Sequence, residues 1–167
     1  DAKNYPKLQI EMINSDNVYT TPDQLSMWRV HYQPVPEAAL NPNRYYTFKD
    51  TLGQGQKIKI GVAIENLTQI PMDSLLVRYD VLDRNNNRIP MGMKRFKPLP
   101  ILDTIQAEFE LSTAGLSGNN TLVVEANPDA DQMEQFHPNN IGYKPFYVVA
   151  DRQNPLIDVT FDGVHIL

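Results

Sequence analysis

Apolar residues recur at every second position in several short segments of this chain. In residues 57–65, isoleucine or valine stands at positions 58, 60, 62 and 64, between lysine, glycine, alanine and glutamate. A helix would distribute these side chains around its circumference, whereas a strand places them all on one face. Because this period rules out a helical core, it constrains the fold more than any other feature and predicts strands that are buried on one face.

The same period recurs in residues 8–12, 75–81, 105–111, 122–126 and 146–150. An asparagine-rich turn follows the second of these segments, and residues 88–96 are interpreted as the return strand of a hairpin. Residues 28–33 alternate as well and predict one further strand. Short strands separated by turn signals are typical of an antiparallel sandwich rather than of a βαβ fold.

Prolines separate these segments and leave little room for helices. The chain contains 13 prolines among 167 residues, and most of them fall between the apolar runs. The best helical candidate is Pro36–Leu40, which has proline in a favourable first-turn position. We therefore predict an all-β fold, an immunoglobulin-like antiparallel β-sandwich of about seven strands with an N-terminal extension.

The predicted organisation has three parts. Residues 1–46 form an extension that packs on the sandwich or leads into it, residues 47–151 form the sandwich, and residues 152–167 form a linker and the first strand of a truncated following domain. The chain begins without methionine and stops inside an alternating apolar run. We therefore expect it to be a piece of a longer polypeptide.

Composition and motif spacing argue against several function classes. The net charge of −5 does not provide the basic surface of a nucleic-acid-binding protein, and no apolar run is long enough for membrane insertion. There is no cysteine, the three histidines lack metal-ligand spacing, and no serine occupies a nucleophile elbow. We expect this chain to be no enzyme and to carry no cofactor.

Two groups of residues are candidate binding sites. Asp129, Asp131 and Glu134 supply the hard oxygen ligands that calcium prefers, although a solvated loop has the same composition. Aromatic residues at four positions could form a platform for a sugar, with packing in the core as the alternative. These are Trp28, Tyr32, Tyr45 and Tyr46.

Three segments resemble the bacterial cell-adhesion-related domain CARDB. The segment GQKIKIGVAIENLT is similar to its second strand and closes on Glu65-Asn66-Leu67, and LSTAGLSGNNTLVVEANPDADQ is similar to a later strand and turn. The segment EQFHPNNIGYKPFYV resembles its closing corner, with Glu134, Asn139 and Asn140 in the matching places and His137 or a neighbour where the family has a second glutamate. The resemblance covers residues 53–149 and implies an immunoglobulin-like sandwich of seven strands, in which these corner residues are structural.

The C-terminal segment KPFYVVADRQNPLIDVTFDGVHIL is similar to a junction in large surface proteins of Bacteroidota. Some of those proteins carry gingipain-type peptidase domains and belong to the type IX secretion machinery or its cargo. The resemblance implies an extracellular or cell-surface location associated with the outer membrane. The partners it implies are neighbouring domains of the same polypeptide and a surface protein or glycan.

The leading hypothesis is therefore a non-catalytic spacer, adhesion or protein-interaction module of an exported bacterial surface protein. A carbohydrate-binding accessory domain is the first alternative. The second is a domain that supports an attached gingipain-type peptidase.

Overall fold

The computed structural model describes residues 9–13, 15, 17–18, 26–32 and 34–152, and the backbone of two short strands, Thr160–Phe161 (β10) and Val164–His165 (β11). The chain divides into two units, Asp1–Gln33 and Pro34–Leu167. In the first unit, the described residues form neither helix nor strand and expose several apolar side chains. Alternation alone does not make a strand there, because a strand needs a neighbour to pair with its backbone groups.

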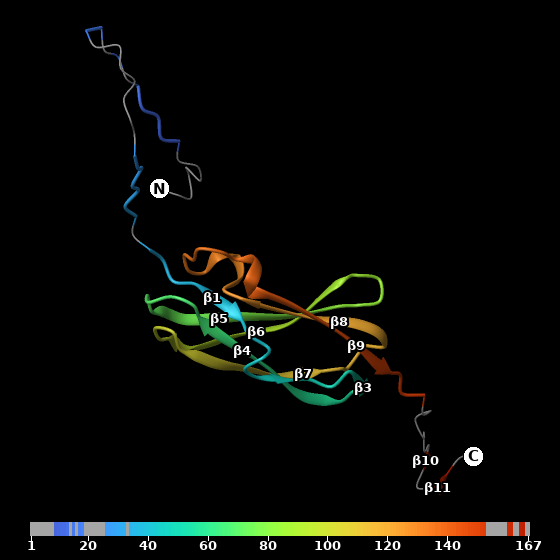
Figure 1. The fold of residues 1–167 in the computed structure, drawn as a ribbon. Coiled ribbons are helices and arrows are strands. Elements are labelled where there is room, and N and C mark those ends of the chain that lie inside the picture. Colours follow the sequence, from blue (N-terminus) through green and yellow to red (C-terminus); the bar gives the residue numbers. More distant parts are fainter. Residues whose placement is uncertain are drawn as a thin grey trace. The chain divides into compact units, whose positions relative to one another are not determined.

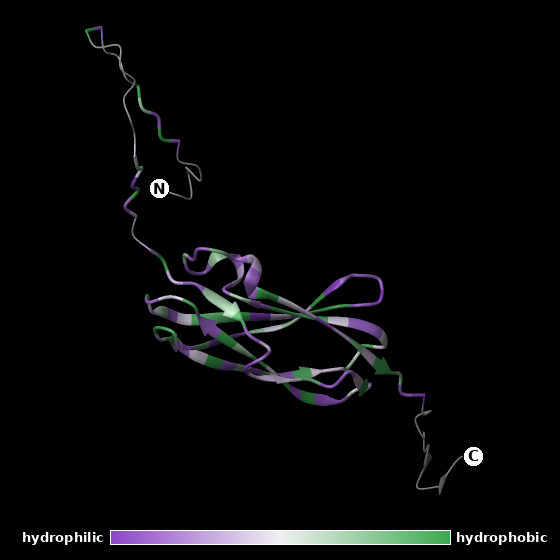
Figure 2. Cartoon of the chain, in the orientation of Figure 1, coloured by the Kyte–Doolittle hydropathy of each residue, from purple (hydrophilic) through white to green (hydrophobic). Residues whose placement is uncertain are grey.

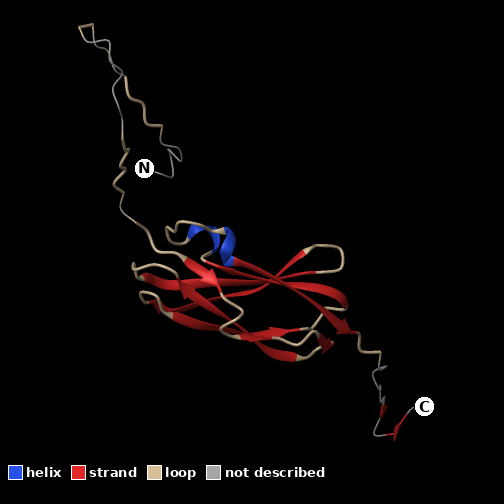
Figure 3. Ribbon diagram, viewed as in Figure 1, coloured by secondary structure: helices blue, strands red, loops and turns tan. Residues whose placement is uncertain are grey.

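The second unit contains a β-sandwich built from two curled sheets (Figures 1 and 3). In one sheet, β4 (Lys57–Asn66) is central and pairs antiparallel along its length with β7 (Thr104–Ser112). Two short strands, β1 (Ala38–Leu40) and β2 (Tyr46–Thr47), pair one after the other with the opposite edge of β4. The alternating run that predicted a strand is thus the centre of this sheet.

The other sheet has the order β3-β9-β8-β5-β6. It contains β5 (Met72–Leu82), β6 (Arg88–Leu99), β8 (Gly118–Ala126) and β9 (Ile141–Val149), all paired antiparallel. At its edge β3 (Thr51–Gly53) runs parallel to the end of β9. The first strands after residue 37 therefore begin on one sheet and continue on the other.

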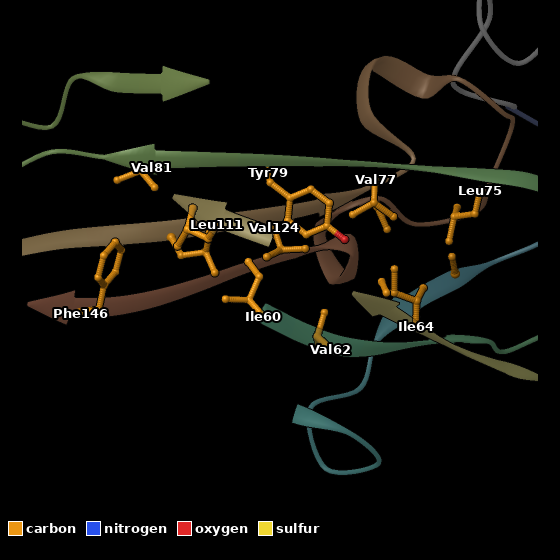
Figure 4. Close-up of a cluster of buried hydrophobic side chains, with 14 of the residues drawn as sticks. Ile60, Val62, Ile64, Leu75, Val77, Tyr79, Val81, Leu111, Val124 and Phe146 are labelled. Carbon is orange, nitrogen blue, oxygen red and sulfur yellow. The ribbon is translucent and has the colours of Figure 1, made fainter. Parts of the chain in front are cut away.

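The alternation of hydropathy is visible along the strands (Figure 2), and the buried apolar side chains of the two sheets form one cluster. Ile60 and Val62 of β4 lie opposite Tyr79 of β5 (Figure 4). The ring of Tyr79 stacks on Phe109 of β7, with ring centroids 4.3 Å apart. Burial of these side chains is the main stabilising contribution to the fold.

Two glycines allow rings to approach the backbone closely. A Cβ atom on Gly61 would lie 2.7 Å from Cε1 of Tyr45, and one on Gly92 would lie 3.2 Å from Cζ of Phe109. Gly92 also has a φ of 145°, in the region that favours glycine. The Gly92 contact belongs to the core, whereas the Gly61 contact lies on the outer face of β4, opposite the buried Ile60 and Val62.

The all-β prediction is confirmed, and so are the six strands expected between residues 57 and 150. The helix expected at Pro36–Leu40 is wrong, because Ala38–Leu40 is a strand paired with β4. Tertiary pairing with an exposed edge here overrides a weak local preference for helix. Strands β1 and β2 bring residues 38–47 into the sandwich, while most of the segment 152–167 lies outside the described residues. No helix among the described residues has the length and apolarity needed to cross a membrane.

Candidate functional site

The loop that joins β8 to β9 covers the outer face of β5 and β8 with a network of charged and amide side chains. It contains two short 3-10 turns, Pro128–Ala130 (η1) and Pro138–Asn140 (η2). Asn127, just before η1, has a φ of 51° and is completely buried. Asparagine tolerates this left-handed backbone, and its amide bonds the loop from inside.

Glu134 is the central acceptor of this loop. The Nδ2 atom of Asn140 donates to both of its carboxylate oxygens at 2.7 Å, and the Nδ2 atom of Asn127 donates at 2.7 Å. Nδ1 of His137 lies 2.8 Å from the same carboxylate, whose side chain is only 5% exposed. Glu134 and Asn140, predicted as parts of one structural corner, are therefore in direct contact.

Asn139, the third predicted corner residue, points to a different carboxylate. Its Nδ2 atom donates to Oε1 of Glu37 at 2.7 Å. The other oxygen of Glu37 accepts the backbone N–H groups of Gln135 and Phe136 at 2.9 and 2.7 Å. Glu37 immediately precedes β1, so this carboxylate joins the start of the sandwich to the loop before its last strand.

A second group of charges lies beneath the loop. Glu125 of β8 accepts Nη2 of Arg78 at 2.6 Å and lies 3.2 Å from Nε2 of His137. Burial raises the pKa of Glu125, but hydrogen bonds from Arg78 and His137 outweigh it and hold that pKa below its ordinary value. The pKa of His137 is raised, first by its hydrogen bond to Glu134 and further by Glu125, against the opposing effect of burial.

The structure places the three calcium candidates on separate partners. Asp129 receives Nη1 of Arg78 at 2.9 Å, and Asp131 receives both terminal nitrogens of Arg95 at 2.9 and 3.0 Å. Glu134 points instead toward the buried amides. Among the described residues, no three acidic or histidine side chains are grouped so that they could hold a metal ion. Arginine guanidinium groups supply the positive charge at these aspartates, a role that the sequence pattern did not indicate.

The four aromatic candidates lie in both units. Trp28 and Tyr32 are 50% and 74% exposed in the first unit. In the sandwich, the hydroxyl of Tyr45 donates to Glu108 at 2.7 Å and its ring covers Gly61, whereas Tyr46 is 45% exposed. Tyr45 is thus engaged in packing, and Tyr46 is the exposed aromatic of the pair.

Tyr46 lies at a pocket that sequence reasoning missed. The pocket has a volume of about 480 Å³ and extends between the two sheets. Its rim includes Tyr46 and Tyr143, which are largely exposed, and its inner wall is formed by buried core side chains. The inner wall includes Ile60, Val62, Tyr79, Ala107, Leu122 and Val124. No pattern in the sequence predicts it, because its lining comes from seven strands and the segments between them, which meet only in the folded chain.

Solved structures with a similar fold include two of the CARDB domain of one Pyrococcus furiosus protein. The solution structure has a TM-score of 0.55 and 17% identity and covers 70% of this chain and 98% of that chain. The crystal structure, described as a complex with di-metal ions, has a TM-score of 0.52 and 16% identity and covers 77% and 100%. A domain of a Methanosarcina acetivorans protein, whose name assigns it to the cell surface, has a TM-score of 0.52 and 18% identity and covers 69% and 93%.

The sandwich therefore has the fold of the CARDB domains. No protein-family model and no curated protein matches the sequence. The resemblance found in the sequence is confirmed at the level of the fold, while the Bacteroidota and gingipain context stays a prediction.

Proposed function

We propose that this chain is a non-catalytic adhesion or interaction module of a large exported surface protein. The observation that carries the proposal is that the sandwich matches nearly the whole length of a CARDB domain and of a domain from a protein named for the cell surface. This likeness supports a self-contained module.

The chemistry of the buried carboxylates supports the same proposal. Glu37, Glu125 and Glu134 accept hydrogen bonds from backbone amides, asparagines or histidine of the surrounding loop, and Glu125 also accepts one from Arg78 of β5. Asp80 is bound by Nε of Arg88 at 2.7 Å. A general acid or base needs a lone pair or a proton that faces a substrate. The three glutamates instead hold the loop on the sheet, and Asp80 joins β5 to β6 through Arg88.

The experiment for this proposal uses the purified 167-residue chain immobilised on beads. We expect intact bacterial cells or extracted surface proteins to bind it more than they bind beads carrying an unrelated sandwich. We also expect peptide and glycoside substrates to remain uncleaved. Turnover of any substrate that is lost on substitution of one side chain in this chain would overturn the non-catalytic assignment.

A carbohydrate-binding role is the second candidate, favoured by a polar hollow at another place on the sandwich. The hollow has a volume of about 400 Å³ and is lined by carboxylate and amide side chains beside the half-exposed Tyr147. Such groups bind sugar hydroxyls, and an aromatic ring stacks on the apolar face of a sugar. Its polar lining includes Asp50, Asp83, Asn86 and Asn119.

Glycan arrays distinguish the two candidate functions. A carbohydrate-binding domain would give a signal that Tyr46→Ala, Trp28→Ala or Tyr147→Ala removes, while Tyr32→Ala tests the remaining exposed ring of the proposed platform. Uniformly low signals across all glycans would leave the protein-interaction role.

We further propose that the parent protein is a Bacteroidota surface protein exported by the type IX system. The support is the similarity of residues 144–167 to junctions in such proteins. Support of an attached gingipain-type peptidase belongs to the same proposal. The domain order of the parent reading frame tests both, since a sorting signal and a peptidase domain would flank this module.

A further inference from the structure

The pocket between the sheets is a candidate ligand site, independent of any adhesion role. Its volume of about 480 Å³ lies within the range of about 300 to 1,000 Å³ that is usual for small-molecule sites. Aliphatic side chains from both sheets form most of its wall, including Leu40, Ile60, Val62, Leu122 and Val124. An apolar molecule placed there would fill space between side chains that are otherwise buried.

Two polar atoms among the lining residues have no hydrogen-bond partner in the described part of the chain. They are the hydroxyl of Tyr79 and the amide oxygen Oδ1 of Asn139. Tyr79 is only 1% exposed, and its ring lies between the sheets (Figure 4). An unpaired buried hydroxyl costs about 1 to 3 kcal/mol, so a ligand that bonded it would remove an existing penalty.

The surroundings of the Tyr79 hydroxyl are suited to a neutral group. Burial alone raises its pKa above the ordinary value, with no contribution from a nearby charge. At the rim, Nζ of Lys144 is already paired with Asp50 at 2.8 Å. A carboxylate or phosphate would lose its hydration in the pocket without finding a free cation there.

An extended peptide fits the pocket less well than a small molecule. The strand β9 forms one side of it, and Tyr147 already donates its N–H outward to the carbonyl of Asp50. Backbone groups two residues apart point to the same edge of a strand, so the nitrogen of Pro145 faces this edge as well, and proline has no N–H to donate. An added strand would therefore find an interrupted ladder next to the pocket.

We propose that this pocket binds a small neutral molecule that is mostly apolar and carries a hydroxyl group. The apolar body would lie among the side chains of the two sheets. The ligand hydroxyl would accept a hydrogen bond from the hydroxyl of Tyr79. Because the amide oxygen of Asn139 can only accept, the same ligand hydroxyl could donate its proton to that oxygen.

The test uses the full chain and three probes of one shape: 2-naphthol, naphthalene and 2-naphthoate. We expect 2-naphthol to shift the backbone NMR signals of Val62, Tyr79, Val124 and Gly142 and to raise the melting temperature. Naphthalene should bind more weakly, and 2-naphthoate should not bind in the pocket.

Two variants assign the binding to this pocket. Tyr79→Phe keeps the ring and should weaken 2-naphthol binding about two- to tenfold while leaving naphthalene binding unchanged or stronger. Ala107→Leu fills the pocket and should remove binding of both. A dispersed NMR spectrum of each variant without probe confirms that it is folded, and Tyr147→Phe serves as a control outside the pocket.

Several outcomes would overturn the proposal. One is the absence of binding by all three probes at millimolar concentration to the folded chain. Another is a set of shifted signals confined to the polar hollow around Tyr147. A third is 2-naphthol binding that neither Tyr79→Phe nor Ala107→Leu changes. None of these results bears on cell or protein adhesion, so failure here is distinct from failure of the proposed function.

Discussion

At the scale of single residues, the stability of the loop over β5 and β8 depends on carboxylates that are completely surrounded by donors. Glu134 receives asparagine amides from both ends of the loop, and Glu37 receives two backbone N–H groups and an amide. Removing such an acceptor leaves buried donors without partners, which costs more than the hydrogen bonds themselves contribute. Of the corner residues recognised in the sequence, Glu134 is such an acceptor, and Asn139 and Asn140 are donors to Glu37 and Glu134.

We expect Glu134→Ala to lower the free energy of unfolding by about 2 to 4 kcal/mol, because the amides of Asn127 and Asn140 lose their shared acceptor. Urea denaturation followed by circular dichroism measures the change. Glu110→Ala is the matched control, because Glu110 forms an ion pair with Lys57, at 3.4 Å, and both side chains are exposed. Such a surface pair contributes little to stability. Equal effects of the two substitutions would contradict the role assigned to Glu134.

His137 gives the fold a dependence on pH. Its pKa is raised above 6.5 by Glu134 and Glu125, and Arg78 faces the second of these from β5. A raised pKa in the folded state contributes stability that is complete below the unfolded pKa and is lost as the pH rises through the folded value. We expect the stability difference between the parent chain and His137→Gln to shrink as the pH rises from about 6 to about 9. Urea midpoints across this range measure it, and a difference that grows with pH would contradict the assignment.

At the scale of elements, hydrophobic alternation predicts the long strands but not the short ones. Strands β4, β5, β7, β8 and β9 each carry enough alternating positions to be recognised, and β6 is predicted from the hairpin turn before it, whereas β1, β2 and β3 have two or three residues and no period. Their existence depends on the free edges of β4 and β9, which belong to the tertiary structure. The same limit applies to the sites, because the sequence marks Glu134 and Asn140 but not Glu37, 97 residues before Glu134 along the chain.

Asn66, recognised in the sequence as the corner after the second strand of the family pattern, joins two loops. It is completely buried, its Nδ2 atom donates to the carbonyls of Ile70 and Pro100 at 2.7 and 3.1 Å, and its Oδ1 atom accepts from the N–H of Thr68 at 2.9 Å. The second loop contains Leu102, which has a φ of 53° and donates its N–H to Thr68. This unfavourable backbone persists because the neighbouring loop holds it.

We expect Asn66→Ala to lower the free energy of unfolding by about 2 to 3 kcal/mol and to accelerate hydrogen exchange at Thr68 and Leu102 first. Asn87→Ala is the control, because Asn87 bonds an exposed carboxylate in the hairpin turn. Exchange that rises evenly over the whole sandwich, with no excess at the two loops, would contradict the proposed link between them.

At the scale of the whole molecule, the sandwich has a core of its own. Every residue of the main buried cluster lies between Ala38 and Val148. This cluster includes Ala38, which lies before residue 47. Glu37, one residue earlier, accepts a hydrogen bond from the N–H group of Phe136. The stable unit in the described part of the chain therefore begins before the boundary at residue 47 that the sequence pattern predicts.

Two truncations test this boundary. Removal of residues 1–33 should change the free energy of unfolding by less than about 0.5 kcal/mol, because the core cluster contains none of them. Removal of residues 1–46 should cost more than about 3 kcal/mol, since it removes Glu37 and β1. Thermal and urea unfolding measure both. A large loss on the first truncation would show that the N-terminal segment packs on the sandwich.

The parallel pairing of β3 with β9 has a consequence for mechanical load. If tension is applied at residue 50, before β3, and at residue 150, after β9, the two strands are drawn in opposite directions along their own axes. Hydrogen bonds such as those of Tyr147 with Asp50 and of Gln54 with Val149 are then loaded together in shear, and not opened one after another like a zipper. The β3–β9 pair therefore resists tension applied along its two strands.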